Sequence, residues 1–79
     1  MASSKSRERV ARNFVNRYGA ERFSALLEAL ASGESGQAIA NDFDVSRERV
    51  RQWKNTFGQV LTLYQVHPEV QRVLDESKS

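Results

Sequence analysis

The sequence predicts an all-α protein, a bundle of five or six helices, and three observations lead to this prediction. Apolar residues recur at helical spacings of three and four residues from Val10 to Tyr64. Gly19, Gly33 and Gly58 interrupt the pattern at places that suit helix ends. No segment alternates apolar and polar residues as a half-buried strand does. The chain therefore divides into short amphipathic helices without a sheet.

Each helix has its own apolar stripe and its own boundaries. The predicted helices span residues 6–18, 20–32, 34–43, 46–57 and 68–75. Pro68 suits the first turn of the last helix. A break is favoured near Gly58, because an interior glycine costs a helix roughly 1 kcal/mol relative to alanine. Residues 6–75 then form a single domain between disordered tails at 1–5 and 76–79.

The segment after Gly58 is nearly apolar on all sides, with Val60, Leu61, Leu63, Tyr64 and Val66. Two interpretations are equally open. The segment packs against the first two helices, or it forms the seam of a homodimer that reads two half-sites of DNA through two-fold symmetry.

Composition excludes several classes of function. The chain of 79 residues has no cysteine, which excludes disulfides, thiol nucleophiles and cysteine-based zinc sites. No His/Asp/Glu cluster has metal-ligand spacing and no Ser-His-Asp set is identifiable, so we expect no metal, no cofactor and no enzymatic activity. No apolar run approaches the length of a membrane span, and the N-terminus lacks a signal-peptide core. We expect a cytoplasmic protein of bacterial or phage origin.

The net charge of +2 is distributed unevenly. Residues 1–22 carry six basic and two acidic side chains, and residues 23–46 carry four acidic side chains and no basic one. Residues 47–55 carry four basic side chains against one acidic. Basic charge clustered in two segments is the electrostatic pattern expected of a DNA-binding protein.

Residues 36–57 have the spacing of a helix-turn-helix. Counting from Gly36, the small residue required at the fifth place is Ala40, where two helices cross closely. Asp44 occupies the ninth place, in a turn that needs a positive φ, and aspartate tolerates that conformation better than most residues. Buried apolar residues are expected at Val45, Val50 and Trp53. The second helix of such a motif enters the major groove of DNA.

A helical wheel divides the second helix of this motif into two faces. Val50, Trp53 and Phe57 fall on one side, and Trp53 is expected in the core. The opposite side, which we call the polar face, spans an arc of about 140°; it consists of Arg47, Glu48, Arg51, Gln52 and Asn55. With the predicted N-cap Ser46 and with Lys54 at the rim of the arc, these residues form the predicted DNA-binding set: Ser46, Arg47, Glu48, Arg51, Gln52, Lys54 and Asn55.

The residue types suggest distinct contacts with double-stranded DNA. Arginine suits guanine O6 and N7, and glutamine suits adenine N6 and N7. Glu48 either accepts from cytosine N4 or orients a neighbouring arginine. Lys54 and Arg12 are expected to contact phosphates.

Several other residues have more than one interpretation. Arg49 projects away from the polar face and is expected to form an ion pair within the protein. The arginines of the first helix form either a second phosphate-binding surface or a merely solubilising face; they are Arg7, Arg9, Arg12 and Arg17. His67, beside Pro68, is interpreted as a helix-boundary residue.

The run from Phe43 to Gln52 (FDVSRERVRQ) closely resembles the helix-turn-helix in the fourth region of bacterial primary sigma factors. In that family a Phe-x-Val-Thr-Arg-Glu-Arg-Ile-Arg-Gln stretch recognises the upstream hexamer of the promoter. The resemblance implies base or phosphate contacts for Arg47, Glu48, Arg51 and Gln52. Trp53-Lys54 stands where the family has isoleucine and glutamate. The likeness implies a way of contacting DNA and not sigma activity, which needs further regions.

The sequence therefore favours sequence-specific binding of duplex DNA by a small bacterial or phage transcriptional regulator. One alternative is a protein-interaction module that binds polymerase, a sigma factor or another regulator. Another is the DNA-binding domain of a longer recombinase or regulator.

Overall fold

The computed structural model describes residues 4–60 and 63–78, and within them the chain forms five helices and a two-stranded sheet. The elements in chain order are α1 (Ser4–Tyr18), α2 (Ala20–Ala31), α3 (Gly36–Phe43), α4 (Arg47–Phe57), β1 (Gly58–Val60), β2 (Tyr64–Val66) and α5 (Pro68–Lys78). The prediction of a mainly helical fold is confirmed for this part of the chain. None of the described helices is long and apolar enough to cross a membrane.

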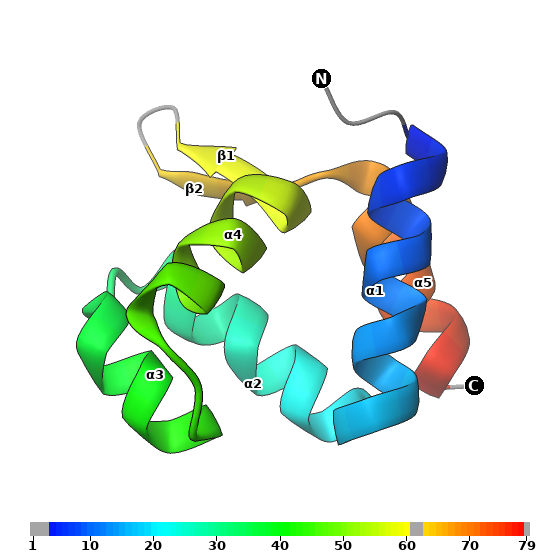
Figure 1. The fold of residues 1–79 in the computed structure, drawn as a ribbon. Coiled ribbons are helices and arrows are strands. Elements are labelled where there is room, and N and C mark those ends of the chain that lie inside the picture. The colour runs from blue at the N-terminus through cyan, green and yellow to red at the C-terminus, as the bar shows by residue number, and fades with distance from the viewer. Residues whose placement is uncertain (1–3, 61–62, 79) are drawn as a thin grey trace.

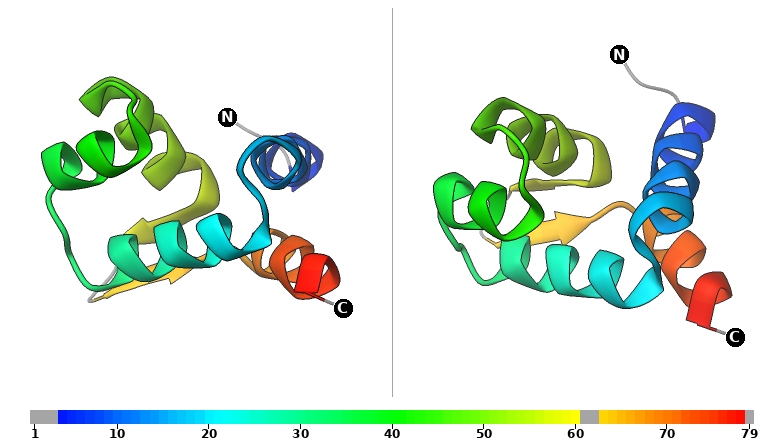
Figure 2. Two further views of the ribbon diagram at one scale, coloured as in Figure 1. Left: turned by 90° about the horizontal axis from the view of Figure 1, so that it is seen from below. Right: turned by 60° about the horizontal axis from the view of Figure 1, so that its bottom comes forward.

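The helices form two pairs joined by α2. In Figure 1, α1 and α5 lie side by side at one end of the molecule, and α3 and α4 lie at the other end. The two views in Figure 2 show α2 running between these pairs, with the short hairpin next to the end of α4. This arrangement places α1 and α4 opposite each other across the core.

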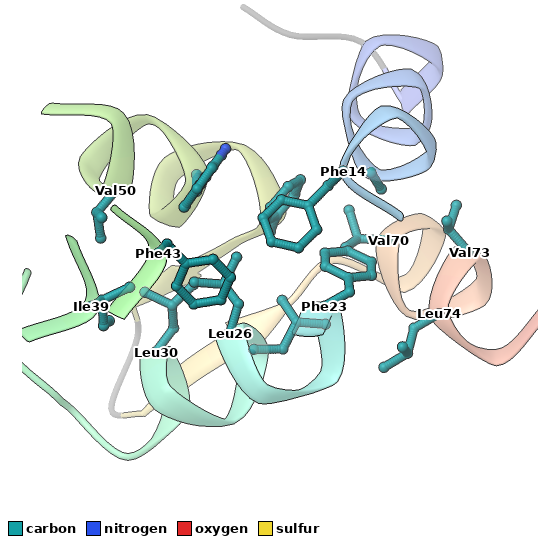
Figure 3. Packing of buried hydrophobic residues seen from close by; sticks show 14 of the residues in the cluster. Phe14, Phe23, Leu26, Leu30, Ile39, Phe43, Val50, Val70, Val73 and Leu74 are labelled. Carbon is teal, nitrogen blue, oxygen red and sulfur yellow. The ribbon is translucent and has the colours of Figure 1, made fainter. Parts of the chain in front are cut away.

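An aromatic cluster at the centre holds the two pairs together. The ring centroid of Phe14, from α1, lies 5.2 Å from that of Phe23, 5.8 Å from that of Phe43 and 5.0 Å from that of Trp53. Figure 3 shows Phe14 pointing from α1 toward the side chains of α2 and α3. Tilted and edge-on ring pairs at such distances add to the stability that burial provides. Trp53 is only 6% exposed, so its predicted place in the core is confirmed.

Several predicted boundaries were wrong by a few residues. α1 begins at Ser4, so the predicted tail is helical from that residue on, and residues 1–3 and 79 lie outside the described part of the chain. α5 continues to Lys78 instead of ending at residue 75, and in its last turn Ser77 Oγ donates to Val73 O (2.8 Å). α3 begins at Gly36, two residues later than predicted, because Ser35 caps it by accepting from Ala38 N (3.1 Å).

The apolar segment after Gly58 forms an antiparallel hairpin, which corrects the prediction that the chain contains no strand. β1 and β2 pair in the register Gly58↔Val66, Gln59↔Gln65 and Val60↔Tyr64. Short apolar runs fit either a helix or a strand, and the β-branched and aromatic side chains here favour the strand. The predicted break at Gly58 is confirmed, since α4 ends at Phe57.

Part of this apolar segment packs inward and part of it is exposed. Tyr64 and Val66 pack against the hydrophobic core, whereas Val60 and Leu63 are 59% and 71% exposed. Leu61 lies outside the described residues. The homodimer seam therefore stays a prediction.

The hairpin also caps the C-terminal end of α4. Tyr64 Oη donates to Lys54 O (2.6 Å), and His67 N donates to Phe57 O (2.8 Å). Both acceptors belong to the last turn of a helix, where carbonyls lack partners within the helix itself. Burial raises the pKa of Tyr64, which keeps its hydroxyl protonated as a donor. His67 O accepts from Val70 N at the start of α5, so the helix-boundary role of His67 is confirmed.

Candidate nucleic-acid interface

The orientation of α4 follows from its apolar stripe. Val50, Trp53 and Phe57 are buried at a spacing of three and then four residues, which places them on one side of the helix. The polar side chains on the other side must then project outward. The structure accordingly exposes every residue of the predicted DNA-binding set: Ser46, Arg47, Glu48, Arg51, Gln52, Lys54 and Asn55.

A short turn fixes α4 relative to α3. Asp44 ends α3 in the left-handed region, with φ 56° and ψ 49°, as its place in the sequence predicts. The turn is closed by a hydrogen bond from Val45 N to Ala40 O (3.0 Å). Ala40 is fully buried, which permits the close approach of the two helices that the sequence predicts.

Ser46 is the N-cap of α4, as predicted. Its Oγ accepts a hydrogen bond from Arg49 N (3.1 Å). The hydroxyl thereby satisfies one of the backbone N–H groups that have no partner within the first turn. The start of α4 is exposed, and the positive end of the helix dipole favours a nearby anion.

The polar face contains a two-point ion pair. Arg51 Nε and Nη2 donate to Glu48 Oε2 and Oε1, each at 2.7 Å. The hydrogen bonds from Arg51 lower the pKa of Glu48, and those to Glu48 raise the pKa of Arg51, so both stay charged. Of the two interpretations of Glu48 from the sequence, its contacts support the one in which it orients a neighbouring arginine. Glu48 accepts from the guanidinium edge formed by Nε and Nη2. The outer edge, which includes Nη1, points away from Glu48.

The remaining cations of α4 have no such partner. Among the described residues, no carboxylate lies within ion-pair distance of Arg47, Arg49 or Lys54. The expectation that Arg49 forms an ion pair within the protein is therefore wrong for this part of the chain. Arg49 lies instead beside a groove between α1 and α4, opposite Asn13 and Arg17.

Two of the arginines of α1 form ion pairs with glutamates of α5. Arg7 Nη1 lies 2.8 Å from Glu69 Oε1, and Arg12 Nη2 lies 3.0 Å from Glu76 Oε2. A third pair runs the other way, between Arg72 of α5 and Glu8 of α1 (2.8 Å). The surface toward α5 is thus an intramolecular contact, and Arg12 belongs to it. Arg17 is different, because it faces α4.

The proximity of Arg17 to Arg49 is not predicted by the sequence. Val10, Asn13, Phe14 and Arg17 follow one another at spacings of three, one and three, so they share one side of α1. That spacing was available as a signal. What the sequence could not supply was the packing that places this side of α1 against the start of α4.

No protein-family model, curated protein or solved structure matches this chain. The resemblance of residues 43–52 to the fourth region of sigma factors therefore stays a prediction, and the chemistry of the exposed side chains carries the functional argument.

Proposed function

We propose that this protein binds duplex DNA sequence-specifically, with α3 and α4 acting as a helix-turn-helix and α4 lying in the major groove. A small bacterial or phage transcriptional regulator is the biological role that fits this activity. The resemblance of residues 43–52 to a promoter-reading segment supports the same mode of contact.

One observation carries the proposal. α4 is buried along one side and fully open along the other, and its open side carries arginine, glutamine and asparagine side chains without an apolar residue. A helix of eleven residues is about 16 Å long and 10–12 Å wide with its side chains. It therefore fits a major groove about 12 Å wide. These side-chain types are the ones that pair with base edges there.

The ion pair on the polar face suggests different roles for Arg51 and Glu48. Arg51 presents its outer guanidinium edge to a purine, for which guanine O6 and N7 are the best acceptors. Glu48 acts as a positioning residue that holds Arg51 before DNA arrives, which reduces the entropy lost on binding. Gln52 lies next along the arc and suits adenine, and Lys54 at the rim suits a phosphate.

The proposal is tested by selecting sites from a random duplex library and measuring affinity for the selected site. Arg51→Ala and Gln52→Ala should each weaken that site by about 1–3 kcal/mol and relax discrimination. Arg72→Ala and Gln71→Ala are matched controls, because Arg72 is also an exposed arginine paired with a glutamate and Gln71 is an exposed helical glutamine. Recovery of no consensus at moderate salt would overturn the proposal.

A protein-interaction function has one observation in its favour. The large exposed apolar side chains among the described residues, Val60 and Leu63, lie on the hairpin and not on α4. If that surface carries the function, Val60→Ser with Leu63→Ser should abolish activity in the cell while duplex binding is unaffected. The DNA-binding proposal instead expects Arg51→Ala to weaken duplex binding.

A further inference from the structure

The α1/α4 groove is lined by basic, amide and aromatic side chains. We define it by Val10, Asn13, Phe14 and Arg17 of α1 with Ser46, Arg49 and Trp53 at α4. Two exposed arginines from different helices border it, and no carboxylate is among its lining residues. Elsewhere on α1, Arg7 and Arg12 are paired with α5.

In the part of the chain that the structure describes, neither of the two arginines is neutralised by a carboxylate. The guanidinium carbon of Arg17 lies over the ring of Tyr18, 5.5 Å from its centroid. Arg49 lies in the first turn of α4, where its backbone N–H is bonded to the capping hydroxyl of Ser46. Within residues 4–60 and 63–78, neither side chain has a carboxylate within ion-pair distance. The groove therefore has a net positive charge and suits an anion.

The position of the groove beside the polar face indicates which anion it would bind. A helix nearly fills the width of the major groove, so the two sugar–phosphate strands must pass along its two flanks. On the wheel, Arg47 and Lys54 lie on one flank of α4, and Arg49 lies on the other, toward α1.

We propose that the α1/α4 groove is a phosphodiester clamp, in which Arg17 and Arg49 grip one strand of the duplex while the polar face contacts the bases. This inference rests on the proposed function and adds α1 to the DNA-binding surface. Asn13 supplies an amide donor from the same side of α1. The apolar floor, with Phe14 and Trp53, provides a surface against which a deoxyribose can pack.

The clamp predicts a specific salt dependence. Arg17→Ala and Arg49→Ala should each make the plot of log affinity against log salt shallower by about 0.9, as expected when one phosphate contact is lost. Neither variant should alter sequence preference. Arg12→Ala is the matched control, since it removes an arginine from α1 that is bonded to Glu76 and faces away from the groove. Its slope should stay within about 0.3 of the wild type.

A methylphosphonate scan identifies the strand that is held. Replacing one phosphate of the selected site at a time with an uncharged methylphosphonate should weaken wild-type binding at one or two positions beside the purine contact. Arg49→Ala should show no further loss at those positions. If Arg17→Ala and Arg49→Ala keep the wild-type salt slope and the wild-type scan while Arg51→Ala still loses discrimination, the clamp is wrong and the DNA-binding function stands. If no duplex is bound, both are wrong.

Discussion

Gly58 is the position at which one added methyl group tests the fold most severely. Its backbone is extended, with φ −168°, so the conformation itself suits any residue. The space around Gly58, however, leaves no room for a side chain. A Cβ would collide with Gln65 O across the hairpin and would lie 2.7 Å from Tyr64 Cζ and 2.8 Å from Tyr64 Oη. The carbonyl belongs to the paired backbone, and the tyrosine hydroxyl donates a hydrogen bond to Lys54 O (2.6 Å), so neither group can move without the loss of a hydrogen bond.

The cost of Gly58→Ala follows from these contacts. Forcing a methyl group into packed structure costs about 1–3 kcal/mol. Loss of the hydrogen bond from Tyr64 to Lys54 adds about 1 kcal/mol. Replacing glycine lowers the entropy of the unfolded chain, which stabilises the folded state by about 0.4–1 kcal/mol. The net loss is about 1–3.5 kcal/mol, out of about 4–12 kcal/mol for a chain of this length. The midpoint of thermal unfolding should fall by roughly 5–25 °C.

Urea unfolding measured by the fluorescence of Trp53, which is the one tryptophan in the sequence, gives this free energy directly. Gly36→Ala is the matched control, because a Cβ at Gly36 would have nothing within 4 Å. Gly36 lies in helix α3, where alanine should leave stability unchanged or raise it by up to about 1 kcal/mol. Equal stability of Gly58→Ala and wild type would refute the close approach of the hairpin to the end of α4.

Three further predictions concern side chains whose partners are known. Glu48→Gln removes the charged two-point contact with Arg51. The selected site should then be bound more weakly and with less discrimination at the purine that Arg51 contacts. Unchanged discrimination in a competition assay would exclude the positioning role of Glu48. Asp44→Gly should match or exceed wild-type stability by up to about 1 kcal/mol, because glycine adopts the left-handed region freely, and a large loss in urea unfolding would show that the aspartate side chain is needed. The hydrogen bond from Arg7 lowers the pKa of Glu69 in the folded protein, so its stabilising effect is complete above the ordinary glutamate pKa of about 4.3 and is lost as the pH falls through the lower folded value. Glu69→Gln should therefore flatten the stability profile in that acid range, and a profile as steep as that of the wild type would count against the pair.

Much of α4 and its surroundings could be predicted from the sequence because local rules agree there. The N-cap at Ser46, the left-handed turn at Asp44 and the apolar stripe ending at Phe57 each depend on residues within one or two helical turns. Such features follow from backbone hydrogen bonding and helical periodicity alone.

The features that could not be predicted depend on contacts between distant segments. The hairpin pairs Gly58 with Val66 across the ladder, and the apolar spacing of the segment also fits a helix. The pairing of Arg12 with Glu76 joins residues 64 positions apart, so the charge of α1 looked available for DNA when only the sequence was considered. Arg49 was assigned an ion pair for the same reason, since nothing in the sequence showed that its neighbour across the groove is Arg17.

The central claim is that the polar face of α4 contacts base edges in the major groove, and one measurement tests it most directly. Each purine of the selected site is replaced in turn by its 7-deaza analogue, which removes the N7 acceptor from the major groove and leaves the minor groove unchanged. Wild-type affinity should fall by about 1–3 kcal/mol at one or more purines, and Arg51→Ala should show no further loss at one of them. Wild-type binding that is equally tight to every 7-deaza duplex would contradict the claim.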